Sequence, residues 1–210
     1  MSSTVSGIAE PSASTTDRIL TAARELFETR GFEVGMGEIA RLAGISRQAI
    51  YLHFASKADL LQRLTTWVEK QADLDSLLQP VFDAPTGEQA LRALIDAAAV
   101  FEPQIHGLAR AVEQAGNRYP EVHTISTDRM RRRLEAMTGI VARIHTDGRL
   151  TPGWDIDRAA AFVWSTTAPA TYHLMVVELG WTPQQWADAT YRLLHDAFIT
   201  TNRSAGCLSC

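Results

Sequence analysis

Apolar residues recur every three or four positions along most of the chain, which predicts helices rather than strands. Such stripes cover residues 16–29, 36–43, 46–54, 57–80, 88–101, 103–115, 121–145, 156–179 and 183–200. Gly, Pro or a capping Ser or Thr stands at most of the boundaries between them. No segment alternates apolar and polar residues as a half-buried strand does. We therefore expect an all-α fold of about nine helices.

Two of these helices are short and meet at Gly44. Glycine readily takes the positive φ that a sharp turn requires. Ala40 is small where the two helices would cross, and Ile45 would fill the turn between them. The pattern indicates a helix-turn-helix, in which the second helix enters the major groove of DNA.

The second short helix has polar side chains along one edge. By its shape, Arg47 is a candidate to contact guanine and Gln48 to contact adenine, while the methyl group of Ala49 fits a thymine methyl. The Tyr, His and Lys that follow are better matched to phosphates. The residues expected to contact DNA are Ser46, Arg47, Gln48, Ala49, Tyr51, His53 and Lys57.

The stretch "IARLAGISRQAIYLHFASKADLL" (residues 39–61) resembles the TetR family of bacterial repressors. The family signature is this helix-turn-helix followed by Tyr-x-His-Phe, a few residues, a Lys and an apolar fourth helix. The match extends over about residues 19–64. It implies a homodimeric repressor with a variable helical domain for small-molecule effectors. Tyr51 and Lys57 match the family's phosphate contacts, and Arg47, Gln48 and His53 lie in its recognition helix.

One segment departs from the family pattern. The second helix usually opens with Ser or Thr, whereas this chain has Gly35, Met36, Gly37 and Glu38 after a turn that is one residue shorter. We do not expect side-chain phosphate contacts at this point. Residues 1–60 are also not basic, so nonspecific affinity for DNA should be modest and sensitive to salt.

Composition and charge add limits to this interpretation. The chain of 210 residues is 46% hydrophobic and 21% charged, which is typical of a globular protein. Its net charge of −4 means that contact with nucleic acid must be a local feature. No apolar run has the length of a bilayer, and the first residues lack the features of a signal peptide, so we expect no membrane partner and a cytoplasmic protein.

These patterns predict four parts. We expect a disordered N-terminal arm (1–14), a helix-turn-helix DNA-binding domain (15–60), a helical ligand-binding and dimerisation domain (61–203) and a flexible tail (204–210). Cys207 and Cys210 have the spacing of a redox or metal pair, but an incidental place in the tail is the favoured interpretation, because a redox pair normally needs a helix N-terminus.

The larger predicted domain carries no catalytic, cofactor or metal motif, so we expect no enzyme activity, no cofactor and no metal. A pocket is expected where Trp164, Ala168 and Tyr172 share one helix face, with His106 as a polar partner and Pro169 as a kink. Its effector should be mostly apolar or aromatic. The candidate ligand-binding residues are Phe101, His106, Met137, Trp164, Ala168 and Tyr172.

The last two predicted helices have apolar stripes that would suit a dimeric four-helix bundle. The candidate interface residues are Phe162, Val176, Trp186, Leu193 and Ala197. The arginine run between Arg129 and Arg133 is either a solvated helix face or a second nucleic-acid patch, and the flanking Asp128 and Glu135 favour the first.

Two other classes of function stay open. The chain could be an all-α small-molecule-binding or carrier protein whose DNA-binding motif is degenerate at Gly35 to Glu38. It could also be a small redox enzyme that uses Cys207 and Cys210, which the sequence supports least.

Overall fold

The computed structural model of the chain describes residues 14–200. The predicted tail with Cys207 and Cys210 lies outside the described residues, as do residues 1–13 of the predicted N-terminal arm. Within residues 14–200 all regular secondary structure is helical, apart from one isolated bridge between Leu150 and Ile199, so the predicted all-α fold is confirmed. None of these helices is both long and apolar enough to span a bilayer.

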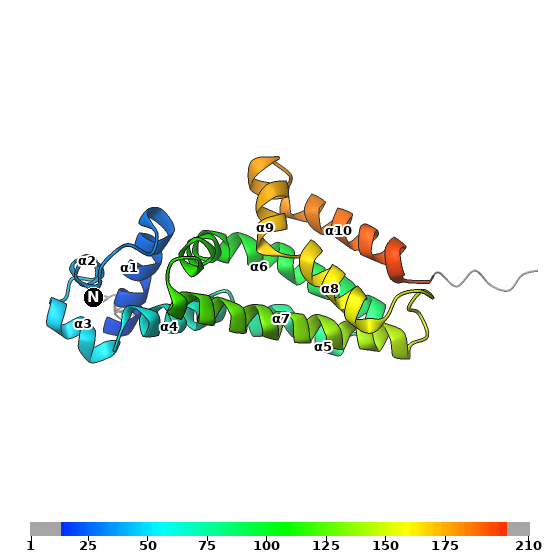
Figure 1. The fold of residues 1–210 in the computed structure, drawn as a ribbon, viewed down its shortest axis with the longest axis horizontal. Helices are drawn as coiled ribbons and strands as arrows, with labels where there is room; N and C mark the ends of the chain where they lie inside the picture. Colours follow the sequence, from blue (N-terminus) through cyan, green and yellow to red (C-terminus); the bar gives the residue numbers. More distant parts are fainter. Residues whose placement is uncertain (1–13, 201–210) are drawn as a thin grey trace, which may run out of the picture. The chain divides into compact units, whose positions relative to one another are not determined.

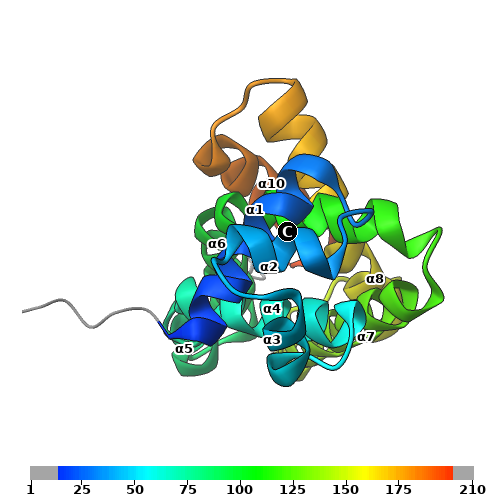
Figure 2. The same ribbon diagram turned by 90° about the vertical axis from the view of Figure 1, so that its left-hand side faces the viewer.

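The chain divides into two compact units between Leu64 and Thr65, four residues beyond the predicted boundary. The smaller unit contains α1 (Thr15–Arg30), α2 (Met36–Leu42), α3 (Arg47–His53) and the first half of α4 (Lys57–Gln71). In Figure 2 the turn between α2 and α3 faces the viewer. The core of this smaller unit is formed by fully buried apolar side chains from all four helices, among them Ile19, Phe27, Ile39, Ile50, Phe54 and Leu60.

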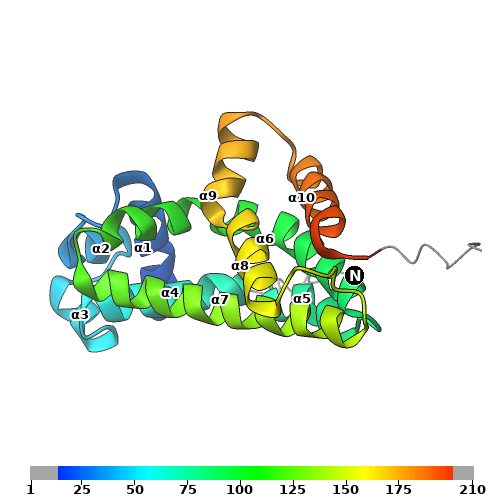
Figure 3. The same cartoon turned by 45° about the vertical axis from the view of Figure 1, so that its right-hand side comes forward.

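The larger unit contains the rest of α4 and six further α-helices. They are α5 (Leu74–Asp83), α6 (Gly87–Gly116), α7 (Pro120–Thr146), α8 (Ile156–Thr166), α9 (Pro169–Tyr172) and α10 (Pro183–Phe198), with a π-helical segment η1 (His173–Glu178) before the last. The two longest helices, α6 and α7, lie side by side (Figure 1). Helix α8 packs on α7, and α10 packs on α6 (Figure 3).

The core of this unit collects the apolar stripes of these helices. Trp186 of α10 is 1% exposed, and its ring meets the edge of Tyr172 at 5.2 Å between centroids. Large aliphatic side chains from α6 and α7 complete the cluster, including Leu91, Ile95, Val141 and Ile144. A helix with such a stripe is stabilised mainly by its tertiary packing.

The structure differs from three of the predicted helix assignments: the break at Pro103, the helix 57–80 and the helix 156–179. Helix α6 runs through Pro103 without a break, because buried residues on both sides of the proline pack against neighbouring helices. The predicted helix 57–80 instead breaks at Asp73, which has a left-handed φ of 49°, a conformation that Asp tolerates better than most residues. Pro80 lies inside α5 rather than at its end.

The third difference concerns the predicted helix 156–179. It ends at Thr166, and a new helix begins at Pro169. Ala168 between them has an extended conformation (φ −64°, ψ 147°), as expected for a residue that precedes proline. Trp164 and Tyr172 therefore do not share one continuous helix.

Candidate functional site

The outward face of α3 is the candidate DNA-binding surface. Its helix is capped by Ser46, whose Oγ accepts a hydrogen bond from the backbone N–H of Ala49 at 3.1 Å, as predicted. Arg47, Gln48 and Tyr51 are exposed, whereas Ala49 is half-buried. Arg47, Gln48 and Tyr51 thus share one accessible edge of α3. Their contacts with DNA stay a prediction.

Leu52 belongs to the same edge and was missed in the sequence. Its side chain is 87% exposed, more than any other large apolar side chain among the described residues. It follows Gln48 by four residues, a spacing that places both on one side of a helix. His53, by contrast, is half-buried, and its Nδ1 lies 3.4 Å from the hydroxyl of Thr16 in α1.

The turn between α2 and α3 is fixed from α1. Gly44 has a φ of +68°, the left-handed conformation expected from the sequence. The guanidinium of Arg18 donates hydrogen bonds to the carbonyls of Ala43 and Gly44, the second at 3.2 Å. These carbonyls lie where α2 ends, so Arg18 satisfies acceptors that the helix itself leaves free.

Lys57 makes intramolecular contacts in this structure. Its Nζ donates to the carbonyl of Phe32 at 2.6 Å and to that of Val34 at 3.3 Å, and it lies 4.2 Å from the centre of the Phe32 ring. The ammonium therefore supports the loop before α2. Its predicted contact with a DNA phosphate stays a prediction.

Gly35 and Glu38 give the departure from the family pattern a structural explanation. The carboxylate of Glu38 accepts a hydrogen bond from the N–H of Gly35 at 3.1 Å, which caps α2 without a Ser or Thr. The same carboxylate pairs with Arg30 at 2.8 Å. The N–H of Gly35, followed by Arg30, holds the pKa of Glu38 below its ordinary value.

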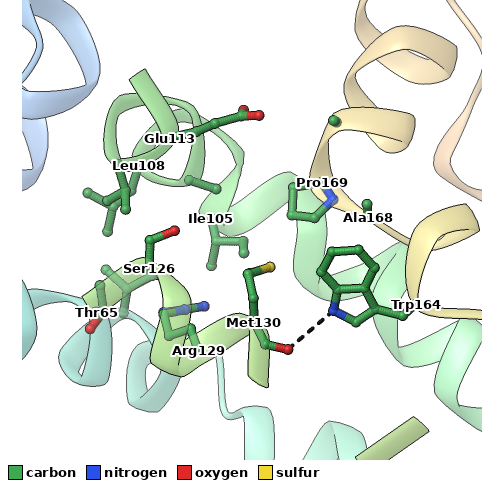
Figure 4. Close-up of a pocket in the computed structure, with 14 residues that line it drawn as sticks. Thr65, Ile105, Leu108, Glu113, Ser126, Arg129, Met130, Trp164, Ala168 and Pro169 are labelled. Carbon is green, nitrogen blue, oxygen red and sulfur yellow. Dashed lines mark hydrogen bonds between the residues drawn. The ribbon is translucent and has the colours of Figure 1, made fainter. Parts of the chain in front are cut away.

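The larger unit has a pocket of about 350 Å³ lined by residues of α4, α6, α7, α8 and α9. Figure 4 shows Trp164, Ala168 and Pro169 on one side and Ile105 and Leu108 of α6 on another. The indole N–H of Trp164 donates to the carbonyl of Met130 at 3.2 Å. The lining residues are Thr65, Val68, Ile105, Leu108, Ala109, Val112, Glu113, Ser126, Arg129, Met130, Trp164, Ala168, Pro169 and Ala170.

Two of the six predicted pocket residues, Trp164 and Ala168, line this pocket. Met137 and Tyr172 lie in the buried core of the unit instead. Phe101 is 9% exposed, and His106 stacks on His173 at 5.0 Å between ring centroids. Neither is among the lining residues, so the structure does not bring these four to the pocket wall.

A buried acid lies next to this pocket on α6. Glu102 is 5% exposed, and its Oε2 has no hydrogen-bond partner. Burial raises its pKa to about 7, although the guanidinium groups of Arg133 and Arg129 act in the opposite direction. Glu102 precedes the lining residue Ile105 by three positions, so the two share one face of α6.

The arginine run of α7 is divided among separate partners. Arg131 is an exposed residue paired with Glu135 at 2.7 Å, as expected for a solvated helix face. Arg133 instead donates to the carbonyl of Trp164 at 3.1 Å and to the hydroxyl of Thr167 at 2.7 Å, at the end of α8. The run is therefore not a continuous exposed patch.

The candidate dimer residues also differ in exposure. Leu193 is 53% exposed, and Phe162, Val176 and Ala197 are half-buried. Trp186 is buried within the protomer, so its side chain has no surface to offer a second subunit, and its place among the interface candidates is corrected. Further exposed apolar side chains come from the region of η1: Leu174, Val177 and Leu179.

Comparison with known proteins identifies the smaller unit. Residues 19–64 match the model of the bacterial regulatory proteins of the tetR family. The HTH-type transcriptional activator FasR of Mycolicibacterium smegmatis is 31% identical over 116 residues, which cover 47% of this chain and 53% of that protein. The chain thus spans about half the length of this curated relative.

Solved structures extend the likeness to most of the chain. A transcriptional regulator from Saccharomonospora viridis in complex with choline is 17% identical with a TM-score of 0.73, over 89% of this chain and 98% of that one. FadR from Bacillus subtilis in complex with stearoyl-CoA is 20% identical with a TM-score of 0.69, over 84% of this chain and 96% of that one. At these identities the likeness shows a common fold. Residues 19–64 thus carry the DNA-binding domain of the tetR family of bacterial regulatory proteins, and the rest of the described chain shares the fold of these regulators.

Proposed function

We propose that the chain is a transcriptional regulator that binds a palindromic DNA operator as a homodimer and responds to a small-molecule effector. The observation that carries this proposal is the exposed edge of Arg47, Gln48, Tyr51 and Leu52 on a helix whose turn is fixed by Arg18. Such an edge pairs hydrogen-bonding groups for bases with an apolar group for thymine methyls. Repression is the expected direction of control, although the relative FasR is named an activator.

Selection from random DNA duplexes tests this proposal. A twofold dimer presents two α3 helices, so the selected sequences should form an inverted repeat with half-sites on successive major-groove faces. Replacing Arg47 by Ala should weaken binding by about 1 to 3 kcal/mol and relax one position of each half-site. Arg24→Ala is the matched control, because this arginine pairs with Glu28 on α1. Recovery of random sequence would favour the alternative, a ligand-binding protein without an operator.

The pocket beside Trp164 is the proposed effector site. Its lining is mostly apolar with a few polar groups, which is typical of small-molecule sites. Helix α4 contributes Thr65 and Val68 to this lining, and the same helix continues back to Lys57 in the smaller unit. An effector that favours one arrangement of α4 would change the affinity for the operator, typically by about 1 to 3 kcal/mol, and the operator would change effector affinity equally.

Tryptophan emission, combined with the variant Trp164→Ala, gives the test of this coupling. Compounds that change tryptophan emission are added to an operator titration of the wild type and of Trp164→Ala. The wild type should lose operator affinity, and the variant should lose its response to the compound. A normal response from Trp164→Ala would place the effector elsewhere.

A further inference from the structure

Arg129 is the only Lys, Arg or His among the residues that line the pocket, and it is already paired with α4. Its Nη1 lies 2.9 Å from Oε1 of Glu69, and the two side chains are 24% and 34% exposed. Figure 4 shows Arg129 on α7 between Ser126 and Met130, with Thr65 of α4 nearby. The ion pair therefore ties α4 to α7 beside the pocket.

The only acidic residue in the lining is in a different environment. The carboxylate of Glu113 is 57% exposed and lies 3.5 Å from Arg110. In Figure 4 it lies across the pocket from Arg129. An ion pair at so exposed a carboxylate contributes little, because water screens it. The charge that can bind a ligand more strongly is therefore the positive one.

The rest of the lining selects an apolar body. Ile105, Leu108, Val112 and Met130 surround the space, and the N–H of Trp164 is already bonded to a carbonyl. Arg133, one turn along α7 from Arg129, is half-buried, and its hydrogen bonds go to the end of α8 rather than to the pocket lining. The pocket thus combines an apolar interior with positive charge on its α7 side.

We propose that the effector is a lipophilic monocarboxylate whose carboxylate displaces Glu69 from Arg129 and so releases α4 from α7. A guanidinium presents parallel N–H groups that match a carboxylate, and a ligand can bring its own carboxylate without changing the charge at Arg129. Glu69 then turns to solvent, where an unpaired carboxylate is hydrated. The ligand class concerns the pocket alone, while the release of α4 rests on the proposed function.

Calorimetric titration of the full chain with decanoate, decan-1-ol and decylamine tests the ligand class. The three probes share a chain and differ in head group. Decanoate should bind several-fold more tightly than decan-1-ol, because its carboxylate takes over the charge-assisted bond to Arg129 while the displaced Glu69 carboxylate is hydrated by solvent. Equal binding of the two, or the tightest binding by decylamine, would overturn the proposal.

Two variants separate the exchange from a merely structural ion pair. Glu69→Gln removes the competitor for Arg129, so decanoate affinity should rise several-fold while decan-1-ol affinity stays the same. Arg129→Gln should abolish the difference between decanoate and decan-1-ol. Arg131→Gln is the matched control, because this arginine is 58% exposed and pairs with Glu135 on the same helix. If Glu69→Gln leaves the decanoate affinity unchanged or lowers it, the ligand carboxylate does not replace Glu69 at Arg129.

The predicted release of α4 is tested by measuring the affinity of the protein for the DNA duplex that the wild-type protein selects. Decanoate should lower the affinity for that duplex, and Glu69→Gln should lower it without any ligand. If the protein selects no duplex, the proposed function fails while the calorimetry still decides the ligand class. If decanoate binds through Arg129 and duplex affinity does not change, the release of α4 is refuted by itself.

Discussion

Replacing Glu102 by Gln should stabilise the larger unit at alkaline pH and change little in mild acid. The wild-type carboxyl is 5% exposed, has an unpaired Oε2, and has its pKa raised by burial from 4.5 to about 7. A raised pKa means that the folded protein holds its proton more tightly than the unfolded chain does. Below about pH 4.5 both states are protonated, so the group contributes no loss of stability there.

The loss develops between the two pKa values. As pH rises from about 4.5 to 7, the unfolded chain ionises first, and the free energy of unfolding falls. A pKa difference of this size corresponds to about 3 kcal/mol, since each pKa unit is worth about 1.4 kcal/mol. Gln has nearly the same shape and no charge, so Glu102→Gln should remove this pH-dependent loss.

Urea denaturation at pH 5 and pH 8 measures the effect. The five tryptophans of the chain, at positions 67, 154, 164, 181 and 186, all lie in the larger unit, so their emission reports its unfolding. The variant should gain about 2.5 kcal/mol over wild type at pH 8 relative to pH 5, because part of the loss is already present at pH 5. Glu135→Gln, whose side chain is 61% exposed, is the control and should show no such difference. A Glu102→Gln variant with the same stability difference from wild type at pH 5 and pH 8 would show that burial of the Glu102 carboxyl does not make the stability depend on pH.

Three further predictions concern packing in the larger unit and the dimer interface. Gly87→Ala should destabilise the larger unit by about 1 to 3 kcal/mol in urea, because an added Cβ would lie 2.3 Å from the backbone N of Ile144, whereas Gly139→Ala, with open space at the Cβ, should not. Trp186→Ala should cost about 3 to 5 kcal/mol of stability in the same assay, since it empties a fully buried site, and a loss of dimer without a loss of stability would contradict its place in the core. Leu193→Glu should separate the protomers in sedimentation while leaving the helical circular dichroism unchanged, and an intact dimer would exclude this exposed residue from the interface.

The helix-turn-helix could be predicted in detail because its signals are local. Gly44 and Ser46 are fixed by turn and cap chemistry that depends on neighbours within a few residues. Leu52 lies on the same outward edge, as its spacing from Gln48 indicates, but it is apolar and so does not stand out among the polar candidates. His53 was placed on this edge, but Thr16 of α1 draws it inward, and such a contact between distant residues leaves no local pattern.

The larger unit was harder because packing decides its helix breaks. Pro103 lies inside α6, where the buried stripe continues on both sides, while Pro169 starts a new helix, and the proline alone does not distinguish the two. The break before Pro169 removed Tyr172 from the predicted pocket face. The pair of Arg129 and Glu69 joins two helices far apart in sequence, so the charge of the pocket became visible only in the fold.

The most direct test of the account is the ratio of affinities for the selected duplex and for a shuffled duplex of the same composition. It is measured for wild type and Arg47→Ala at one fixed salt concentration, because affinity for DNA depends strongly on salt. Sequence recognition by the exposed edge of α3 predicts a large ratio for the wild type and a ratio at least about tenfold smaller for the variant. A ratio near one for the wild type, or an equal ratio for Arg47→Ala, would contradict the assignment of α3 as the helix that recognises DNA.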